Sequence, residues 1–227
     1  MTRAGFTPAE LRRLRALGSP WGIQRALDVM PYHLAGTAWS PRAVLREGTA
    51  HCLEGAVFAA AALRVLGHSP LLVDLEAVQD TDHVIAVFRL RGHWGAIAKS
   101  NFSGLRYREP VYRSVRELVM SYFEGYVNLR GERTLRAFSR PVNLARFDRS
   151  RPGWMISDGD LWWIAEHLVD VPHRRLLSPA MIGALARVDR RSMEAALAGY
   201  RAHAPRPITP RIPGPRRGRP GRPRRRG

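Results

Sequence analysis

Cysteine is nearly absent from this sequence, because the 227 residues include only Cys52. A single cysteine cannot form an internal disulfide bond, and it cannot supply a cysteine-rich metal site. A disulfide-stabilised fold is therefore excluded, and the reducing cytoplasm is the expected compartment. No residue pattern indicates a cofactor or a metal ion, so we expect neither.

Long apolar runs are also missing. No segment approaches the about 18 uninterrupted apolar residues that indicate a transmembrane helix. The first residues, MTRAGFTPAELRRLRALG, lack an apolar core followed by a small-residue cleavage site, so we expect no signal peptide. The 45% of hydrophobic and 25% of charged residues are typical of a soluble globular protein with a sizeable core.

Acidic residues are few, and the imbalance is concentrated near the C-terminus. The chain carries 19 acidic and 37 basic residues, which gives a net charge of +18. Ten arginines and no acidic residue lie in 201–227, which leaves +8 of the +18 on residues 1–200. From Ala204 onward the apolar residues are too few for folding, which predicts a disordered Arg/Pro-rich tail over 204–227. This tail either solubilises the chain or contacts a nucleic acid or another anionic surface.

Capping patterns predict helices in the first third of the chain. Thr7 and Ser19 are each followed by a proline at the first helical position, which is typical of helix starts. A short helix is expected over 41–46. Thr49 can cap a longer helix that runs through Leu66, and this helix is apolar nearly all round. We therefore expect it to be the buried central helix.

The hydrophobic period changes after this helix. Three short apolar or β-branched runs, separated by turn residues, predict antiparallel strands. These runs cover residues 70–78, 83–90 and 94–101. Helical periodicity returns from Val115, the region 131–153 looks irregular, and two amphipathic helices are expected at 157–170 and 178–203.

Together these patterns predict an α+β fold in which helices come first, an antiparallel sheet follows and further helices come last. We expect a main domain over 1–153 that includes the N-terminal helices. A helical extension over 154–203 and the tail over 204–227 complete the predicted organisation.

Cys52 lies in the first turn of the predicted central helix rather than in its apolar middle. Unpaired N–H groups and the helix dipole favour a thiolate at this position, so we expect a depressed pKa and ready alkylation at about pH 6. The same N–H groups can stabilise an oxyanion formed when the thiolate attacks an acyl carbon. The alternative reading is that Cys52 is a small buried hydrophobic residue.

A cysteine nucleophile also needs a base. Among the eight histidines, His83 opens an apolar strand at the edge of the sheet that faces the helix start. Taken alone, this position also suits a capping or packed histidine. The neighbouring Asp80 and Asp82 do not indicate a metal site with His83, because adjacent side chains on a strand point to opposite faces.

The base in turn needs an orienting group, and the hairpin register suggests one. The strands 83–90 and 94–101 flank a three-residue loop centred on Gly92. In an antiparallel hairpin with this centre His83 faces Asn101, whose side-chain oxygen can accept a hydrogen bond from the imidazole. A two-residue turn or a bulge would shift the partner by one residue.

Two stretches carry a resemblance to a known family. RAVLREGTAHCLEGAVFAAAALRVLGHSPLLVDL followed by DHVIAVFRLRGHWGAIAKSN resembles the transglutaminase-like superfamily over residues 20–110. The resemblance implies a papain/transglutaminase-like core, with Cys52 as nucleophile, His83 as base and Asn101 as the orienting residue. The family more often has aspartate where this chain has Asn101, and it has an aromatic soon after the histidine, where HVIAV stands here.

The resulting hypothesis is cysteine-dependent acyl transfer, or hydrolysis of an amide or peptide, with a peptide, protein or carboxamide as substrate. The Cys52 N–H would form part of the oxyanion hole, and Gln24 and Trp39 are candidates for a second donor. Two alternatives belong to other classes. One is a catalytically inactive transglutaminase-like module that binds a partner, and the other is a nucleic-acid or anionic-surface binder that acts through the tail.

Overall fold

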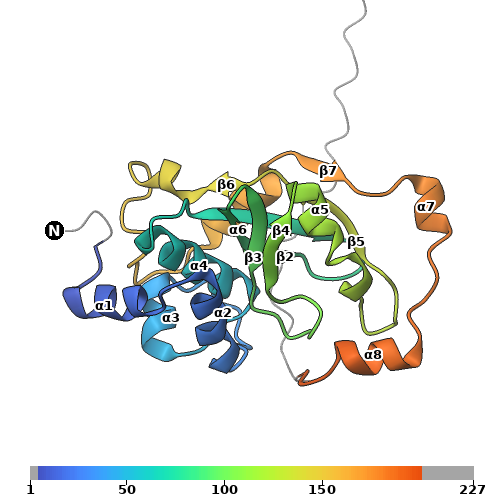
Figure 1. The fold of residues 1–227 in the computed structure, drawn as a ribbon, viewed down its shortest axis with the longest axis horizontal. Coiled ribbons are helices and arrows are strands. Elements are labelled where there is room, and N and C mark those ends of the chain that lie inside the picture. The colour runs from blue at the N-terminus through green and yellow to red at the C-terminus, as the bar shows by residue number, and fades with distance from the viewer. Residues whose placement is uncertain (1–4, 201–227) are drawn as a thin grey trace, which may run out of the picture.

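The computed structural model describes residues 5–200, and the predicted tail at 204–227 lies outside them. The described chain forms an α+β fold (Figure 1). The helices are α1 (Pro8–Ala16), α2 (Pro20–Val29), α3 (Pro41–Glu47), α4 (Cys52–Val65), α5 (Val115–Met120), α6 (Trp162–Asp170), α7 (Pro179–Gly183) and α8 (Arg190–Ala196). The strands are β1 (Leu71–Ala77), β2 (His83–Leu90), β3 (His93–Ile97), β4 (Arg108–Tyr112), β5 (Leu135–Ser139), β6 (Val142–Asn143) and β7 (His173–Arg175).

The seven strands form one sheet in the order β4-β3-β2-β1-β5-β7, and β6 also pairs with β1. All pairs between these strands are antiparallel, as expected for the three strands predicted from the sequence. Side chains alternate between the two faces of the sheet. Val84 and Phe88 of β2 belong to the core beneath α4, whereas Ile85 and Val87 belong to the core on the α5 side. The sheet therefore lies between two hydrophobic layers, with the N-terminal helices on one of its sides (Figure 1).

The helix starts that the sequence predicts at Thr7 and Ser19 are confirmed. The Thr7 hydroxyl accepts a hydrogen bond from the Glu10 N–H at 3.3 Å, and the Glu10 carboxylate accepts one from the Thr7 N–H at 2.7 Å. The Ser19 hydroxyl accepts the N–H of Gly22 at 3.0 Å. These bonds satisfy N–H groups that the first helical turn leaves without partners.

The start of α4 differs from the prediction. The helix begins at Cys52, and its N-cap is His51 rather than Thr49. The Glu54 carboxylate reaches back and accepts the His51 N–H at 3.1 Å. The hydroxyl of Thr49 instead donates to the carbonyl of Pro31 at 2.8 Å, because a loop packs beside it. Cys52 is thus the first residue of the helix, two positions closer to the helix N-terminus than the predicted cap implied.

The turn between β2 and β3 is shorter than predicted. Leu90 pairs with His93, so the connection has two residues, Arg91 and Gly92. Both have positive φ angles, 47° and 83°, which is the geometry that matches the twist of a tight hairpin. The sequence indicated a positive φ angle only at Gly92. The prediction of a three-residue loop is therefore wrong.

The expected pairing of His83 with Asn101 is wrong for the same reason. Moving the turn by one residue shifts every pair in the hairpin, and β3 ends at Ile97 before it reaches this level. The strand partner of His83 is Leu75 of β1, on its other side. Asn101 lies in the loop that follows β3.

The C-terminal third contains more strand than predicted. The region 131–153, expected to be irregular, holds β5 and β6. The predicted helical extension over 154–203 contributes β7, which pairs with β5 in the main sheet, and α6, which packs on the core beneath α4. The helix predicted over 178–203 is divided into α7 and α8, because Asp189 caps a new helix start by accepting the Ser192 N–H at 3.0 Å.

The described helices are short. The longest, α4, has 14 residues and packs against the sheet over most of its length. Within residues 5–200, no helix combines the length and the apolar character that a membrane crossing needs.

Candidate active site

A cavity of about 600 Å³ opens where the start of α4 meets the start of β2. It brings together the three residues to which the sequence analysis gave catalytic roles, although they lie on a helix, a strand and a loop. The polar and aromatic residues of its wall include Tyr32, Cys52, Asp80, Asp82, His83, Ser100, Asn101, Tyr126, Asn128 and Tyr200. Gln24 and Trp39 are not among the residues that line it.

The side chain of Gln24 and the backbone N–H of Trp39 are engaged elsewhere. The Gln24 side chain is buried, accepts the Ala98 N–H at 3.0 Å and donates to the Ala98 carbonyl at 3.1 Å. It therefore ties α2 to the segment that directly follows β3. The Trp39 N–H donates to the Glu54 carboxylate at 3.1 Å, and its ring stacks on His33 with centroids 4.0 Å apart. Both residues hold loops against the core, and we do not assign either to the oxyanion hole.

Cys52 is a neutral thiol in this setting. Its sulfur lies beside the backbone N–H groups of Leu53 and Val84 and beside the Tyr32 hydroxyl, and hydrogen bonding from all three lowers its pKa. Burial acts in the opposite direction and dominates, so the pKa rises to about 11. The depressed pKa expected from the sequence is therefore wrong. A helix N-terminus favours the thiolate, but the surrounding protein atoms desolvate the sulfur and outweigh this effect, although Cys52 as a whole is half-buried and lines the cavity.

His83 is buried at the first position of β2, and its ring nitrogens have distinct roles. Nε2 lies 3.0 Å from the Leu105 carbonyl oxygen, which can only accept a hydrogen bond. Burial lowers the pKa of His83 to about 4, and the nearby positive charge of Arg108 acts in the same direction. The imidazole is therefore neutral near pH 7 with its proton on Nε2. Nδ1 is left as the basic nitrogen.

The Leu105 carbonyl accepts the imidazole hydrogen bond that the sequence predicted for Asn101. Arg108 fixes the turn that presents this carbonyl, since its guanidinium donates to the Gly104 carbonyl at 2.7 Å and to the Ser121 hydroxyl at 2.9 Å. Its Cζ lies 4.0 Å from the centre of the Tyr122 ring. A backbone carbonyl has no residue signature, so sequence patterns could not have identified this group. Asn101 lines the same cavity.

Asp82 precedes His83 in the sequence, and its side chain stabilises the loop between β1 and β2. Its carboxylate accepts the Ala77 N–H at 2.8 Å, and burial together with the nearby charge of Asp74 raises its pKa to about 7. Among residues 5–200, no group of three or more His, Cys, Asp or Glu side chains is arranged to hold a metal ion.

The site thus combines a thiol at a helix N-terminus, a neutral imidazole with a free basic nitrogen, and N–H groups directed at the sulfur. Such a set can attack an acyl carbon and return a proton to the leaving group. In comparisons with known proteins, no family model and no curated protein matches this chain.

Proposed function

We propose that this protein is a cysteine-dependent acyltransferase, or a hydrolase of amides or peptides, with a papain/transglutaminase-like core. One observation carries the proposal. The Cys52 sulfur lies beside the Val84 N–H, and the nitrogen of Val84 is bonded directly to the carbonyl carbon of His83. Nucleophile and base therefore line one cavity, although one begins a helix and the other begins a strand.

The proposed reaction starts from the neutral pair. As the Cys52 sulfur forms a bond to the acyl carbon, Nδ1 of His83 accepts the thiol proton and the carbonyl π electrons move to oxygen. The tetrahedral intermediate collapses when the leaving amine takes the proton from His83, which leaves a thioester on Cys52. Water or an amine then attacks the thioester by the reverse sequence, and the free thiol is regenerated.

Other residues position this pair. The Leu105 carbonyl holds the imidazole through Nε2. The family resemblance implies an orienting role for Asn101, which lines the same cavity as His83. With Nε2 bonded to the Leu105 carbonyl and Nδ1 acting as the base, we assign the orienting role to that carbonyl and leave Asn101 as a residue of the cavity wall. The aromatic rings of Phe102, Tyr126 and Tyr200 line the cavity as well and provide an apolar surface for a substrate. A peptide, protein or other carboxamide is the substrate class that this chemistry serves.

Acetylation by p-nitrophenyl acetate tests the proposal, because this ester acylates a reactive cysteine without a specific substrate. We expect a burst of nitrophenolate and one acetyl group on the peptide that contains Cys52, detected by mass spectrometry. The Cys52→Ala variant should give neither signal while it keeps the same circular dichroism spectrum. A folded wild-type protein whose Cys52 remains unmodified would refute the proposed function and favour a binding module without catalysis.

A further inference from the structure

Tyr32 is a cavity residue that lies beside the nucleophile Cys52. It lies in the loop after α2 and lines the same cavity as Cys52. Its hydroxyl lies near the side chain and the backbone of Cys52, close enough for the two groups to affect each other's pKa. No sequence pattern indicates Tyr32, because it lies 20 residues before the cysteine in a loop with no recognisable motif.

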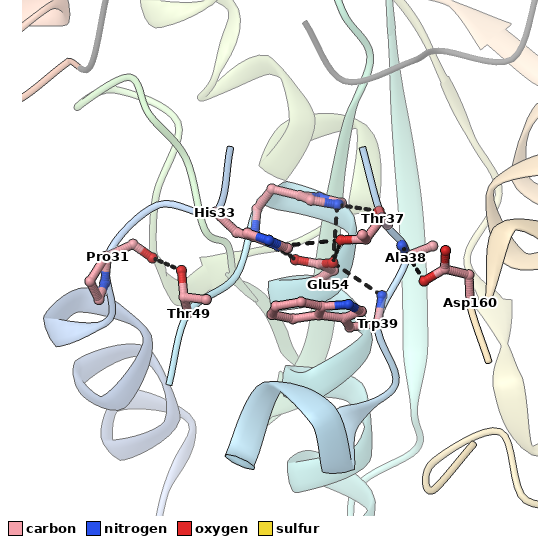
Figure 2. A network of polar contacts seen from close by, with 9 residues as sticks. Pro31, His33, Thr37, Ala38, Trp39, Thr49, Glu54 and Asp160 are labelled. Atoms are coloured by element: carbon pink, nitrogen blue, oxygen red, sulfur yellow. Dashed lines mark hydrogen bonds and ion pairs between the residues drawn. The ribbon is translucent and has the colours of Figure 1, made fainter. Parts of the chain in front are cut away.

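The residues on both sides of Tyr32 are fixed to the segment that leads into α4. The Pro31 carbonyl accepts the Thr49 hydroxyl at 2.8 Å, as Figure 2 shows, and the Ala50 N–H at 3.4 Å. The His33 N–H donates to the Ala50 carbonyl at 3.1 Å. Tyr32 and Ala50 are thereby paired in an isolated parallel β-bridge. The backbone of Tyr32 is therefore held beside Ala50, which precedes the nucleophile Cys52 by two residues.

The buried carboxylate of Glu54 fixes the rest of this loop, residues 33–39, through hydrogen bonds. Glu54, whose side chain is 0% exposed, is the third residue of α4, two positions after Cys52. It accepts hydrogen bonds from the His33 ring at 2.8 Å, from the Thr37 hydroxyl at 2.7 Å and from the Trp39 N–H at 3.1 Å (Figure 2). With the loop fixed on both sides, the Tyr32 side chain is directed at Cys52 before any substrate binds, which is the preorganisation that transition-state stabilisation requires.

We propose, on the basis of the function proposed above, that the Tyr32 hydroxyl is the second donor of the oxyanion hole, beside the Cys52 N–H. The acyl oxygen must come close to the Cys52 N–H when the sulfur attacks. The Tyr32 side chain lines the same cavity wall, and its backbone is paired with Ala50, two residues before Cys52. When the C–S bond forms and the π electrons move to oxygen, the O–H group of Tyr32 donates to that oxyanion. Burial raises the pKa of Tyr32 well above its ordinary value of 10, so the hydroxyl keeps its proton and remains a donor.

Two reagents separate this role from a general effect on the thiol. Acetylation by p-nitrophenyl acetate passes through an oxyanion, whereas alkylation by iodoacetamide displaces iodide and forms none. We expect Tyr32→Phe to slow acetylation of Cys52 by about 10²–10³-fold. Alkylation should change by no more than about threefold, since only a hydrogen bond to the sulfur is lost. The ratio of the two rates, measured in the same sample, corrects for any difference in folded fraction.

Tyr112→Phe is the matched control, because Tyr112 is a β4 residue outside the cavity wall, and it should leave both rates unchanged. Equal changes in both rates for Tyr32→Phe, or no change in either, would overturn the oxyanion role while the wild-type acetylation still supported the proposed function. A wild-type protein that is alkylated at Cys52 but never acetylated would overturn both.

Discussion

Replacing His83 with alanine is expected to slow the acetylation of Cys52 by about 10²–10⁴-fold near neutral pH. The reason lies in the charge state of the pair. Burial raises the pKa of the Cys52 thiol to about 11, so the sulfur does not ionise by itself at pH 7. Burial also lowers the pKa of His83 to about 4, so the imidazole is unprotonated and can accept the thiol proton during attack. Stopped-flow measurement of nitrophenolate release gives the rate.

His93→Ala is the control for this experiment. His93 lies at the β2–β3 turn, does not line the cavity, and contacts the Arg91 carbonyl through Nδ1 at 3.1 Å. Its removal should leave the acetylation rate unchanged. Added imidazole should restore part of the rate in His83→Ala, because it can enter the space left by the ring. A His83→Ala protein that is acetylated as fast as the wild type would show that His83 is only a packed histidine.

Replacing Glu54 with alanine is expected to cost about 5 kcal/mol of folding free energy, because one buried and three half-buried donors lose their acceptor at once and each unsatisfied donor costs about 1–3 kcal/mol when water cannot replace the acceptor. The groups affected are the His33 ring, the Thr37 hydroxyl and the N–H groups of Trp39 and His51. The thermal midpoint should fall by on the order of 10 °C or more for a chain of this size. Calorimetry measures both quantities.

A surface glutamate provides the comparison. Glu47 at the end of α3 pairs with Arg46, and both side chains are largely exposed, so Glu47→Ala should change stability by no more than about 0.5 kcal/mol. The stability of the Glu54→Gln variant should fall between those of the two alanine variants. The amide keeps one acceptor oxygen, but it places its NH₂ group against a donor. A Glu54→Ala protein within about 1 kcal/mol of the wild type would mean that water satisfies the exposed donors.

Local signals explain why much of the fold could be predicted. Serine or threonine followed by proline marks the starts of α1 and α2, and an unbroken apolar stretch marks α4 as the central helix. The strands β1, β2 and β3 are apolar or β-branched runs between turn residues. These features depend on neighbouring residues alone, so the sequence contains them explicitly. The meeting of Cys52 and His83 at one cavity followed from the family resemblance and from the positions of these elements.

The remaining features depend on long-range packing. Arg91 adopts a left-handed conformation that is not expected for an arginine. The hairpin register therefore differs by one residue from the predicted one. Strand β7 has only three residues, two of them arginines, so no alternation was visible. The Leu105 carbonyl at His83 belongs to the backbone, and the direction of the Cys52 pKa follows from burial rather than from helix position.

The pH dependence of Cys52 acetylation tests the central claim most directly. If a neutral thiol passes its proton to a neutral His83 during attack, the rate should rise with the deprotonation of a group whose pKa is about 4. It should then stay level across about pH 6–9, since neither partner changes its charge there. A rate that increases about tenfold per pH unit through this range, toward the thiol pKa of about 11, would show an unassisted thiolate and would contradict the proposed role of His83.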